Sequence, residues 1–158
     1  MSSTNVGAPT GVLYRERLSP SLWALAAAAV CAPMAALVFA PIDTTLALVV
    51  GALVGVAIIA LLVAGSPVLE VRDGMLRAGR ARIPVDLLGD AQILTGEDAR
   101  IARGQRLDPR SWHVIRGGID GIALFTVLDP DDPTPVWVVS SRTPDRLAGA
   151  VRRARGAA

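Results

Sequence analysis

Few side chains in this sequence are of the types that catalyse reactions or hold metals. The chain has one histidine, His113, and one cysteine, Cys31. A metal site at His113 would need further acidic or thiol ligands, because there is no second histidine. Ser111, Ser140 and Ser141 lack the Gly-x-Ser-x-Gly pattern of a nucleophilic serine, and no Walker sequence or dinucleotide fingerprint occurs. We therefore predict no catalytic residue, metal site or cofactor, and we favour a structural role for His113.

The clustered carboxylates do not indicate a metal site either. Asp129, Asp131 and Asp132 follow one another closely, as calcium ligands do, but Pro133 stands at the third ligand position of an EF-hand spacing and the closing glutamate is absent. A proline-rich, solvated turn fits this segment better. We expect the protein not to be an enzyme.

Arginine is the most prominent chemical feature. The chain has 16 basic residues, all of them arginine, and residues 70–84 read EVRDGMLRAGRARIP. From residue 65 onward 14 arginines face 12 acids, an excess too small for a protein that mainly binds nucleic acid. We predict contacts with anionic lipid or a protein partner at these arginines: Arg72, Arg77, Arg80, Arg82, Arg152 and Arg153. Arginines in water, paired with acids as Arg77 with Glu70, are the alternative.

Two apolar segments precede most of these arginines. Residues 21–40 and 44–64 contain no charged residue, and each would span roughly 30 Å as a helix, the thickness of a bilayer core. Only three residues connect them, so we predict an antiparallel transmembrane hairpin. Arginines flank it on both chain ends, whereas the connection holds only Asp43, so the positive-inside rule places both termini in the cytoplasm.

A cleaved signal peptide is the alternative for the first segment, because Val38-Phe39-Ala40 resembles a cleavage site. Pro41 directly after that site and the second apolar segment favour the hairpin. The predicted organisation is therefore a cytoplasmic segment (1–20), a two-helix transmembrane hairpin (21–64) and a cytoplasmic domain (65–158) of a multi-pass cell-membrane protein.

Small residues recur at four-residue spacing in both predicted helices. Gly51 and Gly55 lie in the second, and alanines occupy the same spacing in the first. Such stripes allow close approach of helix backbones in lipid. We favour packing of Gly51 and Gly55 against the first helix of the same chain; a homodimer seam is the alternative, and the oligomeric state stays open.

From residue 67 the hydrophobic period changes to two, which is typical of strands. The Asp73-Gly74 pair is a hairpin signal that sets Val71 opposite Leu76 and Glu70 opposite Arg77. A second turn at residues 79–80 extends this to three strands. Further strands are predicted at residues 91–94, 112–116, 122–128 and 136–140, with a loop or short helix over 95–110 and a terminal helix that begins near Thr143.

Seven short strands and a C-terminal helix match the order of elements in the pleckstrin-homology superfold. We therefore predict a small, mainly-β PH-like domain after the membrane hairpin. This is an analogy of fold and implies no function by itself.

Three stretches resemble a known family. They are residues 14–18 (YRERL), residues 71–84 (VRDGMLRAGRARIP) and residues 129–142 (DPDDPTPVWVVSSR). They are similar to actinobacterial membrane proteins grouped as domain of unknown function 3093, over residues from Tyr14 to near the C-terminus. The sequence departs from that pattern at residues 19–23 and 117–118. The resemblance implies no activity.

The function we predict is that of a membrane-anchored binding or scaffolding module with two spans in the lipid bilayer. The alternative is an accessory subunit of a membrane transport or envelope-synthesis complex, docked through the Gly51 and Gly55 face.

Overall fold

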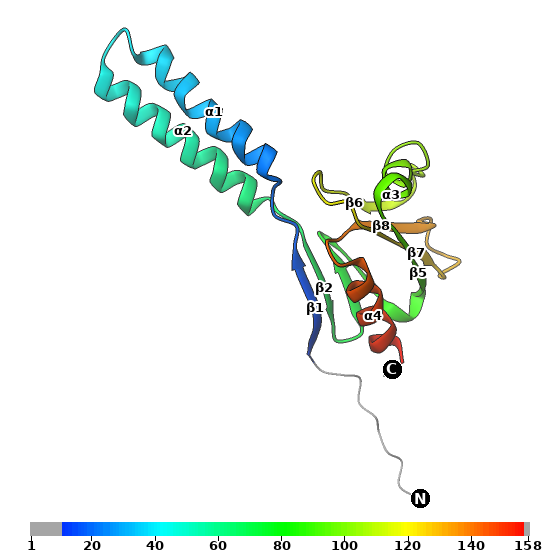
Figure 1. Cartoon of the computed structure of the whole chain (residues 1–158). Helices are drawn as coiled ribbons and strands as arrows, with labels where there is room; N and C mark the ends of the chain where they lie inside the picture. Colours follow the sequence, from blue (N-terminus) through cyan, green and yellow to red (C-terminus); the bar gives the residue numbers. More distant parts are fainter. Residues whose placement is uncertain (1–10, 157–158) are drawn as a thin grey trace, which may run out of the picture. The chain divides into compact units, whose positions relative to one another are not determined.

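A computed structural model describes residues 11–156 of the chain and divides it into two units (Figure 1). One unit consists of residues 19–66. The other consists of residues 11–18 together with residues from 67 onward. The second unit is therefore built from two separate stretches of the chain.

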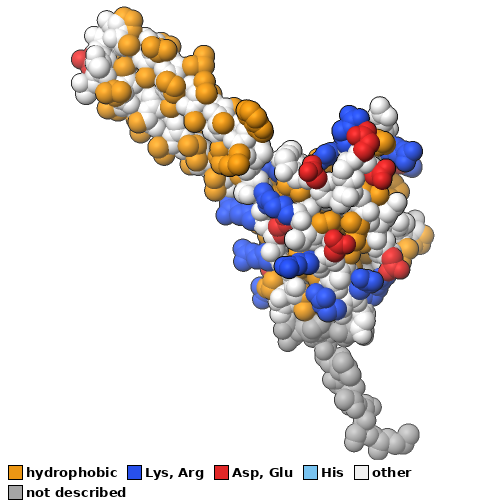
Figure 2. All heavy atoms as spheres, in the orientation of Figure 1, with side chains coloured by type: hydrophobic (Ala, Val, Ile, Leu, Met, Phe, Trp, Pro, Cys, Tyr) orange, Lys and Arg blue, Asp and Glu red, His pale blue; other side chains and the backbone are white. Residues whose placement is uncertain are grey.

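Residues 19–66 form a helical hairpin of α1 (Leu22–Phe39) and α2 (Thr44–Ala64). Each helix has a side-chain cap, because Ser21 Oγ accepts from the Ala24 amide and Asp43 Oδ1 accepts from the Leu46 amide. Both helices are long and apolar enough to cross a membrane. Apolar side chains cover the surface of the hairpin in Figure 2, as expected for helices that do not face water.

The two helices meet along small residues. The buried positions of α1 and α2 are Ala28, Ala47, Gly51 and Gly55. A Cβ added at Gly51 would lie 2.8 Å from the carbonyl oxygen of Ala32 and 2.9 Å from Cβ of Ala36. The glycines therefore allow a close approach of the two backbones that no larger residue permits.

The first sheet has four antiparallel strands in chain order. They are β1 (Val12–Arg17), β2 (Val68–Arg72), β3 (Met75–Ala78) and β4 (Ala81–Pro84). Val71 lies opposite Leu76, Glu70 opposite Arg77, and Leu76 opposite Ile83. The register predicted from the Asp73-Gly74 turn is confirmed. Asp73 and Gly74 both have positive φ, 49° and 71°, as a type I′ turn requires.

The prediction that residues 1–20 form a separate segment is corrected by strand β1, which belongs to the first sheet. It pairs with β2, although the whole helical hairpin separates the two strands in the sequence. Arg15 lies opposite Glu70 and Arg17 opposite Val68. The register shifts between Val12 and Tyr14, so apolar and polar residues do not alternate cleanly along it. That irregularity and the distance to β2 in the sequence hide the strand. The predicted domain, residues 65–158, is therefore incomplete without β1.

The second sheet has the order β5-β7-β8-β6, with β6 parallel to β8. A short 3₁₀ turn, η1 (Val85–Leu87), leads from β4 into it, and one short helix, α3 (Gly96–Ala102), lies within the stretch predicted as loop or helix. The four strands correspond to the four predicted segments, with β5 starting three residues earlier: β5 (Leu88–Leu94), β6 (Trp112–Val114), β7 (Ile122–Val127) and β8 (Val136–Ser140).

The C-terminal helix α4 (Pro144–Arg155) closes the core between the sheets. Leu147, Val151 and Ala154 are buried together with Leu69 of β2 and Phe125 of β7. The helix packs against β1, β2, β5 and β7. The unit is thus mainly β with one terminal helix, as predicted.

Candidate functional site

The exposed face of the first sheet carries a row of charged side chains, one from each strand. The cross-strand partners run Arg15, Glu70, Arg77 and Arg82. Directly opposed residues point to the same side of a sheet, and the neighbouring positions Leu69, Val71, Leu76, Ala78 and Ile83 are buried on the other side. We call the row Arg15, Glu70, Arg77 and Arg82 the arginine row.

Arg77 and Arg82 of this row have few hydrogen-bond or ion-pair partners. Arg77 donates from Nε to the Gly79 carbonyl oxygen at 3.2 Å. Among the residues that the structure describes, no acid lies within ion-pair distance of Arg77 or Arg82. Two like charges directly opposite one another on adjacent strands repel. The arrangement therefore favours an anion beside these two arginines.

The surface around the row is a shallow hollow. It has a volume of about 340 Å³. Its lining consists of Met75 and five charged side chains: Glu70, Arg72, Asp73, Arg77 and Arg82. Arg72 at its far end donates from Nε to Oδ2 of Asp73 at 3.0 Å. Arg72 is thus partly neutralised, in contrast to Arg82.

The register divides the predicted arginines between two ends of the sheet. Arg17 ends β1, and the Leu18 amide beside it donates to the Pro67 carbonyl oxygen at 2.9 Å. The β3–β4 turn, which contains Arg80, lies at this same end, because Ala78 pairs with both Leu69 and Ala81. Arg72 lies at the opposite end, beside the Asp73-Gly74 turn.

Arg152 and Arg153 do not join the arginine row. Both are exposed on α4, which packs through its apolar side against the buried face of the first sheet. Arg153 instead lines a separate groove with Tyr14, Arg142 and Asp145. The structure therefore separates the predicted contact arginines into two surfaces.

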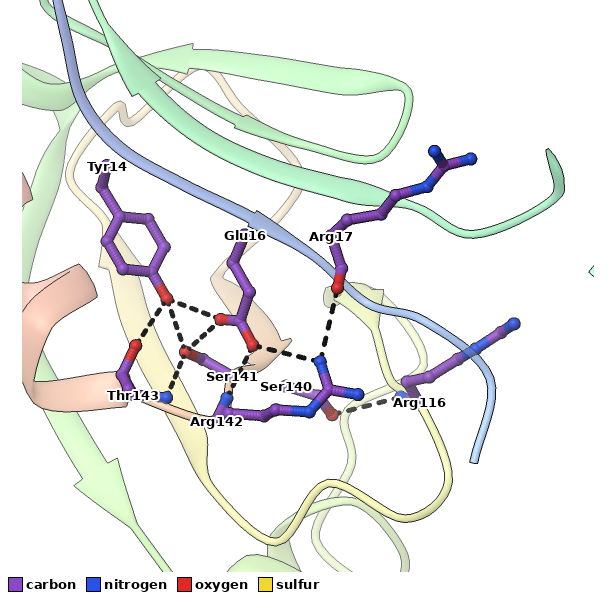
Figure 3. A network of polar contacts seen from close by, with 8 residues as sticks. All are labelled: Tyr14, Glu16, Arg17, Arg116, Ser140, Ser141, Arg142 and Thr143. Atoms are coloured by element: carbon purple, nitrogen blue, oxygen red, sulfur yellow. Dashed lines mark hydrogen bonds and ion pairs between the residues drawn. The ribbon is translucent and has the colours of Figure 1, made fainter. Parts of the chain in front are cut away.

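A buried carboxylate network joins β1 to the connection between β8 and α4 (Figure 3). Glu16 Oε2 accepts from the hydroxyl of Tyr14 at 2.5 Å and of Ser141 at 2.7 Å, while Oε1 accepts from the Arg142 amide at 2.9 Å. The Tyr14 oxygen also lies 3.0 Å from the Thr143 hydroxyl. Only 12% of the Glu16 side chain is exposed. The network fixes the N-terminal strand to the segment that starts the C-terminal helix.

The protonation of Tyr14 responds to this environment. Burial raises the pKa of Tyr14, and the hydrogen bond to the Glu16 carboxylate raises it further. Both effects disfavour a phenolate beside a carboxylate. Tyr14 is therefore a donor in this network at neutral pH.

The sequence did not indicate the network. Tyr14 and Glu16 lie more than 120 positions from Ser141, and residues this far apart in one sequence give no pairing signal. An inward-facing acid two residues after a tyrosine in a strand is the only local sign. A buried acid of this kind requires donors from elsewhere in the fold.

The other polar candidates lie apart from the row and the network. His113 is exposed on β6, with Nδ1 3.3 Å from the Ser111 carbonyl oxygen. No group of three or more His, Cys, Asp or Glu side chains able to hold a metal occurs within residues 11–156. Asp129 and Asp132 accept from the amides of Asp131 and Thr134, which are turn interactions.

Comparison with known proteins identifies the family of the chain and nothing further. A family model described as "Protein of unknown function (DUF3093)" matches residues 13–151. The chain belongs to this family. The DUF3093 match begins within β1 and ends within α4, so it includes the helical hairpin and both parts of the mainly-β unit. No curated protein and no solved structure matches the chain.

Proposed function

We propose that this DUF3093 protein is an integral membrane protein of the cell membrane that holds a binding domain at the cytoplasmic surface. Its two helices cross the bilayer, and both termini lie in the cytoplasm. The observation that carries the proposal is the continuity of β1 with α1 and of α2 with β2. Two adjacent strands of one sheet thus lead into the two apolar helices.

The length and charge of the hairpin support this topology. α1 and α2 have 18 and 21 residues, which span roughly 27 and 32 Å at the rise of an α-helix. The connection between them carries only Asp43, whereas arginines occupy both strands at the other end. By the positive-inside rule, the strands lie on the cytoplasmic side.

The domain itself is proposed to be PH-like. Strands β1 to β4 form one antiparallel sheet, β5, β7 and β8 form most of a second, and α4 packs between them. With β1 included, four strands, three strands and a terminal helix follow the order expected of that superfold, and β6 is an addition at the edge. We propose that the domain binds a ligand and does not catalyse a reaction, because the exposed charged side chains of the arginine row are its most prominent chemical feature.

The accessory-subunit alternative loses its specific support. It relied on Gly51 and Gly55 as a docking face for helices of a partner. Gly51 already packs against Ala32 and Ala36 of the same chain, and Gly55 packs against Ala32. Any partner helix would therefore contact a different side of the hairpin.

Membrane extraction and reporter fusion test the proposal. The protein should stay in the membrane pellet after alkaline carbonate washing. A green fluorescent protein fused after residue 158 should fluoresce, and alkaline phosphatase fused at the same position should be inactive. Release by carbonate, or an active phosphatase fusion, would overturn the proposed topology.

A further inference from the structure

We propose that the arginines of the arginine row, Arg15, Arg77 and Arg82, together with Arg17 and Arg80, bind the anionic phosphate headgroups of the bilayer in which the protein is anchored. This inference rests on the proposed membrane topology and adds the binding target. It assigns the contact to the exposed face of β1 to β4 and to the end of that sheet where β1 ends and β2 begins. Arg72, Arg152 and Arg153 have no part in it.

The tethers keep this end of the sheet close to the headgroups. Three residues, 19–21, separate Leu18 from α1, and residues 65–66 separate α2 from Pro67. Connections this short reach about 10 Å when fully extended. The Debye length at physiological ionic strength is about 8 Å. The two lengths are similar, so charges at the tethered end feel a weakened surface potential even when the connections are fully extended, and a stronger one when they are not.

The charge pattern fits a phosphate. Arg77 and Arg82 lie directly opposite on adjacent strands, with Cβ atoms about 5 Å apart at such positions. Guanidinium groups bind phosphate oxygens through paired N–H donors. A phosphate between the two side chains would replace their mutual repulsion by attraction to both. Glu70 on the next strand limits the positive charge on that side, which orients the anion toward Arg82.

The shape of the surface is compatible with lipid headgroups, and the tether to the bilayer favours them over free anions. The hollow beside the row is shallow and holds about 340 Å³, and it lies on one face of a sheet. A flat array of headgroups can cover such a face, and tethering makes the bilayer a ligand at high effective concentration. The small excess of arginine over acid gives too weak a field for a long polyanion.

The register gives the proposal its specificity. Arg17 and Arg80 lie at the tethered end, and Arg77 and Arg82 lie next to it. Arg72 is at the far end and is paired with Asp73. A nonspecific attraction would depend on all exposed arginines about equally, whereas this contact depends on their position.

Energy transfer from the domain to the bilayer tests the contact in the full chain. Cys31 is replaced by alanine. Pro84, which is exposed on the same face as the row but does not line the hollow, is replaced by cysteine and labelled with a donor dye. The protein is placed in nanodiscs of phosphatidylcholine alone, or of an equimolar mixture with phosphatidylglycerol, with an acceptor dye on a headgroup. Transfer should be greater in the mixture and should fall to the neutral-lipid level in high salt.

Substitutions identify the residues responsible. Each arginine that reaches an anionic surface shifts the contact equilibrium about fivefold, so Arg77→Gln with Arg82→Gln should weaken it about thirtyfold. The matched control, Arg152→Gln with Arg153→Gln, removes the same charge from α4 and should leave the transfer unchanged. In a Trp23→Phe background, fluorescence of Trp112 and Trp137 checks that each variant is folded.

Two results would overturn the inference. One is equal transfer on neutral and anionic discs, which would indicate no headgroup contact. The other is an equal loss in the control pair, which would indicate attraction by total charge alone. Failure of the chain to insert into neutral discs, seen as full protease sensitivity of residues 22–64, would instead contradict the proposed topology.

Discussion

Removing strand β1 from the mainly-β unit should destabilise it strongly, although β1 is separated from the rest of the unit by the whole hairpin. Two soluble proteins make the comparison. In the joined domain, a short Gly/Ser loop replaces residues 19–66 and connects Leu18 to Pro67. This closure is compatible with the fold because the Leu18 amide already donates to the Pro67 carbonyl oxygen at 2.9 Å. The second protein is residues 67–158 alone.

The size of the effect follows from what residues 12–18, β1 and the leucine directly after it, contribute. Leu18 is fully buried, and burial of a leucine stabilises a fold by about 2 kcal/mol. Glu16 accepts hydrogen bonds from Ser141 and from the Arg142 amide, and hydrogen bonds to a charged group contribute about 1.5–3 kcal/mol each. The strand therefore stabilises the unit by about 5 kcal/mol, which equals the entire stability of many small domains.

Urea unfolding followed by tryptophan fluorescence measures this difference. Both proteins contain Trp112 and Trp137, whose rings lie 6.1 Å apart, and neither contains Trp23. The joined domain should unfold in one cooperative transition, and residues 67–158 should show none or one at much lower urea. Within the joined domain, Glu16→Ala should remove about 3 kcal/mol, and the exposed control Arg15→Ala less than about 0.5 kcal/mol. Equal stability of the two proteins would refute the assignment of β1 to this unit.

Three further substitutions test other parts of the structure. Burial and Glu16 raise the pKa of Tyr14 above 10.0, so its contribution is complete below about pH 10 and is lost as pH rises through the raised pKa. Tyr14→Phe in the joined domain should therefore flatten the fall of urea stability above pH 10; an unchanged slope would exclude Tyr14 as its source. Gly51→Leu should destabilise the full chain by about 1–3 kcal/mol, because the leucine side chain would clash with the facing helix. This loss is measured as a lower melting temperature in detergent. The exposed control Ala52→Leu should not lower it, and equal effects would contradict the packing at Gly51. Gly74→Ala should cost the joined domain about 1 kcal/mol in urea unfolding, because φ is 71°; an unchanged midpoint would argue against the turn.

Local patterns in the sequence predicted the helices and the first hairpin well. The uncharged segments ended close to the bounds of α1 and α2 because apolar length and capping residues are encoded locally. The Asp73-Gly74 pair fixed the register of β2 and β3, because only one register sorts Leu69 and Val71 from Glu70 and Arg72. From that register the charged row across β2, β3 and β4 also follows.

Contacts between segments that are distant in the sequence could not be predicted from it. β1 has an irregular pattern and pairs with a strand more than fifty residues away, so nothing local marks it as part of the sheet. The Glu16 network is missed for the same reason. Charge alone groups Arg152 and Arg153 with the arginines of residues 70–84. Only the packing of α4 shows that they lie on a separate surface.

Cysteine labelling tests the central claim, a hairpin that crosses the membrane with the mainly-β unit on the cytoplasmic side. In a Cys31→Ala background, a single cysteine replaces Ile42, in the connection between α1 and α2, or Gln105, in an exposed loop of the mainly-β unit. Spheroplasts are treated with a membrane-impermeant maleimide before and after permeabilisation. The Ile42→Cys protein should react at once, and the Gln105→Cys protein only after permeabilisation. Labelling of Gln105→Cys in intact spheroplasts would contradict the account.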